Sequence, residues 1–414
     1  MQRTGRAGSA HDTWLKTMTQ LILPQVDGSL APYTVRGPAS FTPPASTAEG
    51  TRFNRIAFSA AHVVADARAA IDPWLQCAVD WDATIAYRQR LWKLGLGVAE
   101  AMDTAQRGMG LDWPTSLELI RRSLDAAKDH PGALVASGCG TDHLAPEAAR
   151  GVDDVIRAYS EQMEAIENLG GRLIVMASRA LARVARGPDD YARVYDHVLS
   201  QARQPVILHW LGDMFDPALA GYWGSADIPR AMDTAVSIIA RHAKKVDGIK
   251  ISLLDKDREI EMRRRLPAGV RMYTGDDFNY AELIAGDGVG EHANQRQSDA
   301  LLGIFDAIAP AASAALAALA VGDTARFHAI LEPTVPLSRH IFRAPTRFYK
   351  TGVVFMAWLN GHQDHFVMVG GQQSTRSLPH FAELFRLADA AGLIEQPDLA
   401  VARMKTLLAL HGVQ

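Results

Sequence analysis

The chain of 414 residues carries a net charge of -3 at pH 7, and 48% of its residues are hydrophobic and 21% charged, which is typical of a globular protein with a large core. It has no basic run of the kind that binds nucleic acid, no stretch of about 18 consecutive apolar residues that could span a membrane, and no apolar leader near its start. Its two cysteines, Cys77 and Cys139, are too few for a disulfide framework or a cysteine-based zinc site, so we expect a cytoplasmic protein.

The first part of the chain reads as an extension that precedes the main domain. Residues 1–10 are polar and rich in small residues, so we expect them to be disordered, with Met18 as an alternative natural start. Two short extended runs within 21–35 flank the pair Asp27-Gly28, which is a strong signal for a β-hairpin. Residues 38–50 are rich in proline, serine and threonine and predict a linker.

Hydrophobic strands then alternate with amphipathic helices. Short apolar runs bounded by turn residues predict eight strands, at 55–59, 97–101, 133–136, 172–176, 205–209, 246–252, 270–273 and 288–292. Segments with helical periodicity separate them, at 84–94, 116–128, 146–168, 189–202, 230–243 and 256–265. We expect Asp82 to cap the first of these helices. The alternation predicts an α/β protein whose strands close into a (β/α)8 TIM barrel.

From Ser298 onward the pattern is helical. Helical blocks exceed what is needed to close a barrel, at 312–331, 346–359, 381–391 and 399–411. The sequence therefore predicts three parts, an N-terminal hairpin extension with its linker over 1–52, the barrel over 53–310, and a C-terminal helical region over 311–414 that packs on the barrel.

The predicted strand 246–252 carries the most informative residue. Because side chains alternate along a strand, Lys250 faces the same side as Gly248 and Ser252, among apolar neighbours. A buried ammonium is costly unless it is paired or loses its proton, which favours a neutral amine that can attack a carbonyl. The structural alternative is a lysine that extends from the strand end into solvent.

Other polar side chains follow the remaining strands, and in a barrel functional residues gather at the C-terminal ends of strands. His209 ends the fifth predicted strand, and we expect it to transfer protons because the pKa of histidine lies near physiological pH. Candidates for substrate binding are His62, Asp103, Thr104, Gln106, Ser178, Asp276 and Asp277, together with Asp142 and His143. We expect at least one of the adjacent acids Asp276 and Asp277 to cap the helix that follows.

The only glycine pattern of interest for a nucleotide follows the third predicted strand. Gly138 and Gly140 give a G-x-G spacing within 137–141, but the third glycine of a dinucleotide site is missing. We interpret this segment as a tight loop in which the glycines let the backbone approach a ligand.

Four segments in a fixed order carry a resemblance to a known family. They are Val246-Asp247-Gly248-Ile249-Lys250, Pro205-Val206-Ile207-Leu208-His209, Thr274-Gly275-Asp276-Asp277, and the stretch from Ala344-Pro345-Thr346-Arg347-Phe348-Tyr349-Lys350 to Gly361. These resemble, in turn, the G-[IVL]-K of the sixth strand, the P-x-[IV]-[LI]-Y of the fifth strand, the S-G-D-D turn, and the start of the C-terminal helices in the dihydrodipicolinate synthase and N-acetylneuraminate lyase superfamily. The resemblance extends over about residues 53–393.

That resemblance implies a lyase or aldolase in which Lys250 forms a Schiff base with a small carbonyl compound, a keto acid or keto-sugar derivative, without a cofactor and in a homodimer or homotetramer. His209 stands where the family keeps a catalytic tyrosine. The family's Gly-Thr-Thr-Gly-Glu loop is replaced by residues 102–108, in which one threonine follows Asp103, a poor arrangement for a carboxylate unless Arg107 turns inward. This departure argues against pyruvate condensation and against dihydrodipicolinate synthesis itself.

Two other classes of function remain open. Histidines and acids at strand ends also allow a metal-dependent aldolase, isomerase or epimerase, although no H-x-H or H-E-x-x-H spacing is present. A barrel that binds a small ligand without catalysis is the second alternative. The favoured interpretation is a protein that acts on a small-molecule substrate. It binds no metal, and neither nucleic acid nor a membrane is its partner. The polar segment 291–299 is expected to cover the mouth of the barrel.

Overall fold

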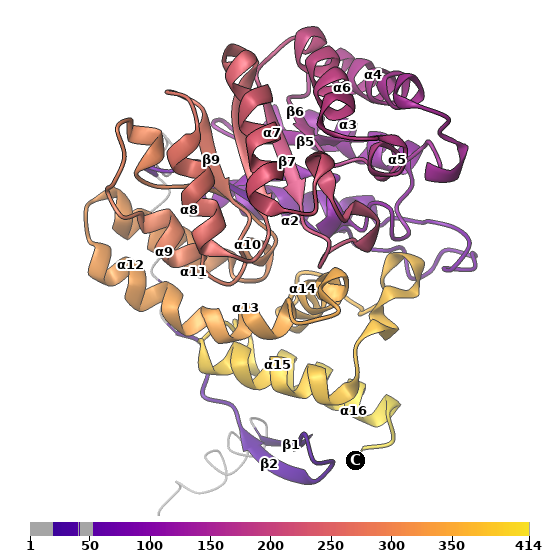
Figure 1. Cartoon of the computed structure of the whole chain (residues 1–414). Coiled ribbons are helices and arrows are strands. Elements are labelled where there is room, and N and C mark those ends of the chain that lie inside the picture. The colour runs from indigo at the N-terminus through magenta and orange to yellow at the C-terminus, as the bar shows by residue number, and fades with distance from the viewer. Residues whose placement is uncertain (1–19, 40, 42–52, 414) are drawn as a thin grey trace, which may run out of the picture.

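The computed structural model describes residues 20–39, 41 and 53–413. Eight parallel strands close into a barrel in the order β10-β3-β4-β5-β6-β7-β8-β9 (Figure 1). The strands are β3 (Ala57–Ala60), β4 (Gly97–Glu100), β5 (Val135–Cys139), β6 (Leu173–Val175), β7 (Val206–Leu211), β8 (Val246–Ser252), β9 (Arg271–Thr274) and β10 (Asp299–Leu302). The predicted (β/α)8 barrel is confirmed.

Helices connect the strands on the outside of the barrel. They are α2 (Trp81–Lys93), α3 (Trp113–Ala127), α4 (Val152–Asn168), α5 (Arg179–Val184), α6 (Pro188–Gln201), α7 (Ile228–Arg241), α8 (Lys256–Arg265), α9 (Tyr280–Ala285) and α10 (Ile304–Ala307). The expected cap of the first helix is wrong, because Asp80 accepts a hydrogen bond from the Ala83 N–H at 3.0 Å, while Asp82 lies in the first turn. An acid in that turn still interacts favourably with the helix dipole.

Alternation along the strands separates the inside of the barrel from the layer beneath the helices. Inside lies a small apolar cluster, Phe58, Ala60, Ala99, Met102, Ala136, Ile174, Met176, Ile207, Tyr273 and Leu301. On β8, Ile249 and Ile251 belong to the outer core beneath the helices, so Gly248 and Lys250 face inward. A Cβ at Gly248 would lie 2.7 Å from the Tyr273 ring, so this glycine makes room for the largest side chain of the inner cluster.

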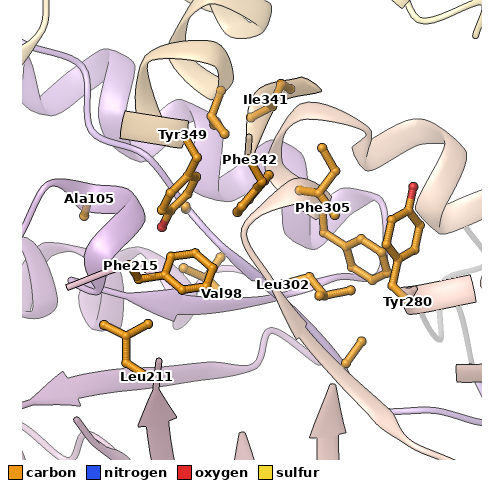
Figure 2. Packing of buried hydrophobic residues seen from close by; sticks show 14 of the residues in the cluster. Val98, Ala105, Leu211, Phe215, Tyr280, Leu302, Phe305, Ile341, Phe342 and Tyr349 are labelled. Atoms are coloured by element: carbon orange, nitrogen blue, oxygen red, sulfur yellow. The ribbon is translucent and has the colours of Figure 1, made fainter. Parts of the chain in front are cut away.

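The C-terminal region consists of α11 (Ala309–Ala320), α12 (Thr324–Leu331), α13 (Val335–Ile341), α14 (Tyr349–Leu359), α15 (Leu378–Ala390) and α16 (Pro397–Leu410). α11 runs along the outside of the barrel, where the Leu319 carbonyl accepts a hydrogen bond from Asn54 ahead of β3. α13 and α14 cover the end of the barrel at which the strands finish. In Figure 1, α13 and α14 lie between the barrel and α15. Figure 2 shows Phe342 and Tyr349 from this region reaching down to Phe215, and the Phe342 and Tyr349 rings stack with centroids 4.4 Å apart.

The N-terminal hairpin lies against these helices rather than against the barrel (Figure 1). Its strands β1 (Gln20–Pro24) and β2 (Leu30–Thr34) pair antiparallel around the predicted Asp27-Gly28 turn, so the hairpin is confirmed. Leu21 and Leu23 are buried against the core, while Ile22 between them is exposed, as the alternation of a strand requires.

The predicted position of the eighth strand is wrong. It lies at Asp299–Leu302, within the part of the sequence that we had interpreted as helical, and not at 288–292. The strand begins with the charged residue Asp299, so a search for apolar runs does not detect it. Asp299 accepts hydrogen bonds from the Ile56 N–H at 2.7 Å and from Arg271 at 3.1 Å. The segment 291–299 leads into this strand, and Asn294 bonds to the Pro267 and Val270 carbonyls ahead of β9. The segment therefore lies at the end opposite to the mouth, and the expectation that it covers the mouth is wrong.

The predicted tight loop after the third strand is also wrong in part. Residues Ser137, Gly138 and Cys139 belong to β5. A Cβ at Gly138 would lie 2.6 Å from the Ala101 carbonyl oxygen, so this glycine accommodates the neighbouring chain rather than a ligand.

Some expectations concern residues outside the description. The disordered start at 1–10, the alternative start Met18 and most of the linker 38–50 lie outside the described residues. The division of the chain at residues 52 and 310 remains a prediction.

Candidate functional site

Lys250 and His209 are neighbours on adjacent strands inside the barrel. The register of β7 and β8 pairs the Cα of His209 with that of Lys250, and both side chains point inward because Ile207 and Gly248, two residues earlier on the same strands, do so. Lys250 is 7% exposed and His209 is 1% exposed. The fold therefore brings together the two residues for which we predicted catalytic roles.

The amine of Lys250 lies in a buried environment that favours its neutral form. Burial lowers its pKa, and the negative charges of Asp277 and Asp103 oppose this shift. Within the described residues the amine makes no hydrogen bond or ion pair. Its Cε lies next to Gly275, where a Cβ would approach it to 2.8 Å. Such burial favours the neutral amine, which is the nucleophilic form.

His209 is neutral in this position. Burial lowers the pKa of its imidazole well below the usual value, and the nearby charge of Lys250 adds to the effect. Its Nε2 atom lies 3.5 Å from the Ser252 hydroxyl. A neutral imidazole beside the amine can accept a proton, because one of its ring nitrogens carries a free lone pair.

The two adjacent acids after β9 have separate roles. Burial raises the pKa of Asp277 to about 7, against the charge of Lys250, and its Oδ1 accepts the Ile304 N–H at 2.9 Å. Asp276 accepts the N–H groups of Phe278 and Asn279 at 2.8 and 3.0 Å. Asp276 thus stabilises the turn before α9. The expectation that one of the pair caps α9 is wrong, because Asn279 is the residue at the cap position and no side chain of the described residues caps this helix.

The loop after β4 joins the barrel to the C-terminal helices. Its Thr104 hydroxyl lies 2.8 Å from the hydroxyl of Tyr349, the first residue of α14. Gln106, with φ +65°, donates from Nε2 to the Val369 carbonyl at 2.6 Å. Asp103 borders the cleft described below. Of the three predicted residues in this loop, Asp103 alone combines a place in the cleft with a charge that acts on Lys250.

Arg107 does turn inward, but its guanidinium is already occupied. It donates to Asp142 at 3.0 and 2.7 Å, to the Gly138 carbonyl and to Gln162. The Arg107 pair also holds the pKa of Asp142 below its usual range against the effect of burial. Arg107 therefore fixes the cleft wall in place more than it offers free donors to a carboxylate.

His62 and Ser178 lie at strand ends and are bound into local structure. His62 is fully buried, and its Nδ1 lies 2.8 Å from Asp306 while its Nε2 has no partner among the described residues. The Ser178 hydroxyl accepts the Leu181 N–H at 3.0 Å as the cap of α5 and lies 2.6 Å from the Thr141 hydroxyl. Their predicted role in substrate binding remains a prediction.

A cleft of about 610 Å³, counting the space open to solvent, lies at the C-terminal ends of the strands. Its polar walls come from several loops, with Asp103, Arg107, Thr141, Asp142, Arg179 and Asp216. His209 reaches it from β7, and Leu211 and Met176 supply apolar surface. Polar side chains and apolar surface thus both line the cleft.

Tyr349, Lys350 and Arg179 were missed as site residues from the sequence. Tyr349 and Lys350 belong to the segment 344–361, which we singled out by resemblance without assigning it a role. They lie about 100 residues further along the chain than Lys250. Only the packing of α14 over the mouth brings them to the loop after β4, where Tyr349 contacts Thr104 and Lys350 contacts Met109; Figure 2 shows Tyr349 beside Phe215. Arg179 follows Ser178 at the start of α5, a helix that the sequence pattern did not predict.

The described residues were also compared with the requirements of a metal site and of a membrane-spanning helix. Among residues 20–39, 41 and 53–413, no group of three or more histidine, cysteine or acidic side chains is close enough to hold a metal ion. No helix in the described part of the chain is both long and apolar enough to cross a membrane.

A family model described as "Protein of unknown function (DUF993)" matches residues 21–413. The chain belongs to this family. No curated protein matches the DUF993 chain.

Solved structures of the dihydrodipicolinate synthase family share its fold. The enzyme from Aquifex aeolicus is 12% identical with a TM-score of 0.61, over 82% of this chain and 99% of that one. YagE, a prophage protein of Escherichia coli K12 in complex with pyruvate, is 15% identical with a TM-score of 0.58, over 88% and 100%. The enzyme from Acinetobacter baumannii, chloride-inhibited and complexed with pyruvate, is 14% identical with a TM-score of 0.58, over 82% and 99%. The predicted resemblance is thus confirmed at the level of the fold.

Proposed function

We propose that this DUF993 protein is a lyase, of the aldolase or hydro-lyase type, that forms a Schiff base between Lys250 and a small carbonyl substrate. The observation that supports it most directly is the buried amine of Lys250, which has no hydrogen bond within the described residues and stands beside the neutral imidazole of His209. The shared fold with dihydrodipicolinate synthases agrees with this assignment.

The reaction begins with attack of the neutral Lys250 amine on the carbonyl carbon. The resulting carbinolamine takes up a proton on its hydroxyl group and loses water, which leaves a protonated imine. Burial raises the pKa of Asp277 to about 7, and its charge acts more strongly on Lys250 than that of Asp103. In this proposal Asp277 supplies the proton.

The imine then serves as the electron sink. The substrate carries a hydroxyl group on its β carbon, the second carbon from the imine carbon. His209 removes the proton of this hydroxyl group, and the bond between the α and β carbons breaks. The electron pair of that bond moves toward the imine and forms an enamine, while the other fragment leaves as a carbonyl compound. Protonation of the enamine and hydrolysis of the imine release the second product and restore Lys250.

A keto acid or a keto-sugar derivative is the proposed substrate. The polar cleft walls provide partners for several hydroxyl groups. Pyruvate is bound in two of the similar structures and is one probe for this chain. The single threonine of the loop after β4, whose hydroxyl is already bonded to Tyr349, favours hydroxylated compounds over pyruvate itself.

Reductive trapping tests the proposal. The protein is incubated with pyruvate, hydroxypyruvate, dihydroxyacetone and keto-sugar acids, reduced with borohydride, and analysed by intact mass and peptide mapping. We expect a covalent adduct on Lys250 that disappears in Lys250→Met and persists in Lys244→Met, a matched change at an exposed lysine. Adducts that are equally abundant in Lys250→Met, or no adduct with any carbonyl, would overturn the proposal.

A further inference from the structure

A second cationic group borders the cleft at the start of α5. Arg179 uses its Nε to pair with Asp216, whereas its two terminal Nη groups donate no hydrogen bond to the described residues. The Arg179 side chain is 38% exposed and lines the cleft. The guanidinium therefore presents two parallel donors to whatever occupies the cleft, the geometry that suits a carboxylate or phosphate.

The loop after β4 is shaped around this guanidinium. Gly108 has a φ of +72°, a backbone conformation that favours glycine. A Cβ at this position would lie 2.7 Å from Nη1 of Arg179. Any other residue at position 108 would thus push Arg179 aside, so the local chain holds space for the charged group at the cleft wall.

Lys350 brings a second positive charge from the C-terminal helices. It is 5% exposed, and its Nζ donates to the Arg347 carbonyl at 3.1 Å and lies 3.4 Å from the Met109 sulfur. It also lies over the Tyr349 ring, 4.7 Å from the centroid. No carboxylate of the described residues is within hydrogen-bond distance. A buried ammonium with these partners is incompletely compensated.

Lys350 lies behind the cleft wall, where it contacts Met109, the residue that follows the lining residue Gly108. Burial lowers the pKa of Lys350 to about 8; Asp103 and Asp216 oppose the shift, and Arg179 and Arg347 add to it. Asp103, Asp216 and Arg179 all line the cleft. The charge of Asp103 acts on both Lys250 and Lys350, so one carboxylate influences both buried amines.

We propose that Arg179 and Lys350 form an anion subsite of the cleft, which binds a carboxylate or phosphate group of the substrate. On the proposed function, the substrate is then a carbonyl compound whose anionic group is remote from the carbon that Lys250 attacks. A bound anion supplies the partner that the Lys350 ammonium lacks and accepts the free Nη donors of Arg179. The subsite makes the C-terminal helices part of substrate recognition.

Anion binding is measured in the full chain carrying Lys250→Met, so that no imine contributes. Inorganic phosphate and gluconate are titrated calorimetrically, with sorbitol as the uncharged counterpart of gluconate. We expect one of the anions to bind and sorbitol not to bind, and the anion preferred identifies a phosphoryl or a carboxylate ligand. Lys350→Met and Arg179→Gln should each weaken binding about tenfold or more, whereas Lys244→Met should leave it unchanged.

Two further measurements separate recognition from a loss of structure. Lys350→Arg keeps the charge and should restore most of the affinity if the variant Lys350→Met fails for electrostatic reasons. The affinity for gluconate should fall as the pH rises above about 8, because Lys350 loses its proton, and this dependence should vanish in Lys350→Met. Equal affinity in all variants, or binding of neither anion, would overturn the subsite.

The outcome is distinguishable from that of the proposed function. Anion binding that depends on Lys350 while no carbonyl compound labels Lys250 would retain the subsite and refute the Schiff base. In the opposite outcome, dihydroxyacetone phosphate and dihydroxyacetone label Lys250 equally and no anion binds. That result would refute the subsite and retain the Schiff base.

Discussion

At the scale of single residues, the site depends on competition between burial and charge at Lys250. Burial lowers the pKa of the amine and Asp277 raises it again. Replacing Asp277 with asparagine removes the charge but keeps an oxygen that can accept the Ile304 N–H. We expect the pKa of Lys250 to fall further in Asp277→Asn, since the protonated amine loses its attractive neighbour.

The pH profile of reductive trapping measures this shift. The midpoint at which labelling of Lys250 rises with pH should lie below 10.5, the usual pKa of lysine, and should move to lower pH in Asp277→Asn. Asp276→Asn is the matched control, because Asp276 bonds to the turn 276–279 and should leave the midpoint in place. A midpoint that rises or stays fixed in Asp277→Asn would contradict the assigned charge pairing.

The candidate site could be predicted in part from residue order alone. Strand alternation and the G-x-K and P-x-x-x-H segments predict Lys250 and His209 on the same face of neighbouring strands, and the register confirms that they are paired neighbours. Tyr349 and Lys350 could not be found this way, because their proximity to the cleft depends on how α14 packs. The charges on Arg179 and Asp216 also gave no signal, since acids and arginines are common in loops.

At the scale of elements, helices with strong periodicity were predictable and short charged strands were not. The strongly periodic helix predicted at 116–128 overlaps α3 (Trp113–Ala127), whereas β10 begins with Asp299 and was missed. Asp299 belongs in the barrel because its charge is neutralised by Arg271 and by the Ile56 N–H. Such compensation comes from distant parts of the chain, and a local pattern does not contain it.

A buried acid joins α8 to the strands beside it. Glu259 accepts the Thr274 and Ser298 hydroxyls, both at 2.8 Å, and burial raises its pKa to about 8 from a usual 4.5. The folded protein therefore holds this proton between pH 4.5 and about 8, where the unfolded chain releases it. The contribution of Glu259 to stability is complete below pH 4.5 and declines with rising pH across that window, by at most about 1.4 kcal/mol per pH unit.

The variant Glu259→Gln removes this proton linkage while it preserves a neutral, hydrogen-bonding side chain. We expect its free energy of unfolding, relative to the parent, to rise from pH 5 to pH 8 by about 1 kcal/mol or more. Urea unfolding at a series of pH values measures the difference. Glu164→Gln, at an exposed position of α4, should show no such trend, and a flat difference for Glu259→Gln would contradict the raised pKa.

At the scale of the whole molecule, three layers are stacked on the mouth of the barrel. Tyr349 and Lys350 of α14 lie over the loop after β4, α15 lies behind α14, and the N-terminal hairpin lies behind α15 and α16 (Figure 1). The first segment of the described chain thus supports the helices that include α14, which carries Lys350, one of the two residues proposed to bind the anion. This arrangement links the stability of the hairpin to the order of the cleft.

The buried residue Asp389 of α15 connects the N-terminal segment to the C-terminal helices. It accepts hydrogen bonds from the Tyr33 hydroxyl at 2.7 Å and from the N–H groups of Arg36 and Gly37 at 3.0 and 3.3 Å. Asp389→Ala leaves these donors unpaired and should lower the free energy of unfolding by about 1.5 to 3 kcal/mol. Amide hydrogen exchange should quicken over residues 20–37 and α15, and less strongly in α14, while β7 and β8 keep their protection. Asp364→Ala, at a fully exposed side chain, is the control. If exchange quickens equally in β7 and β8, the hairpin, the C-terminal helices and the barrel unfold as one unit, and the hairpin does not support the cleft selectively.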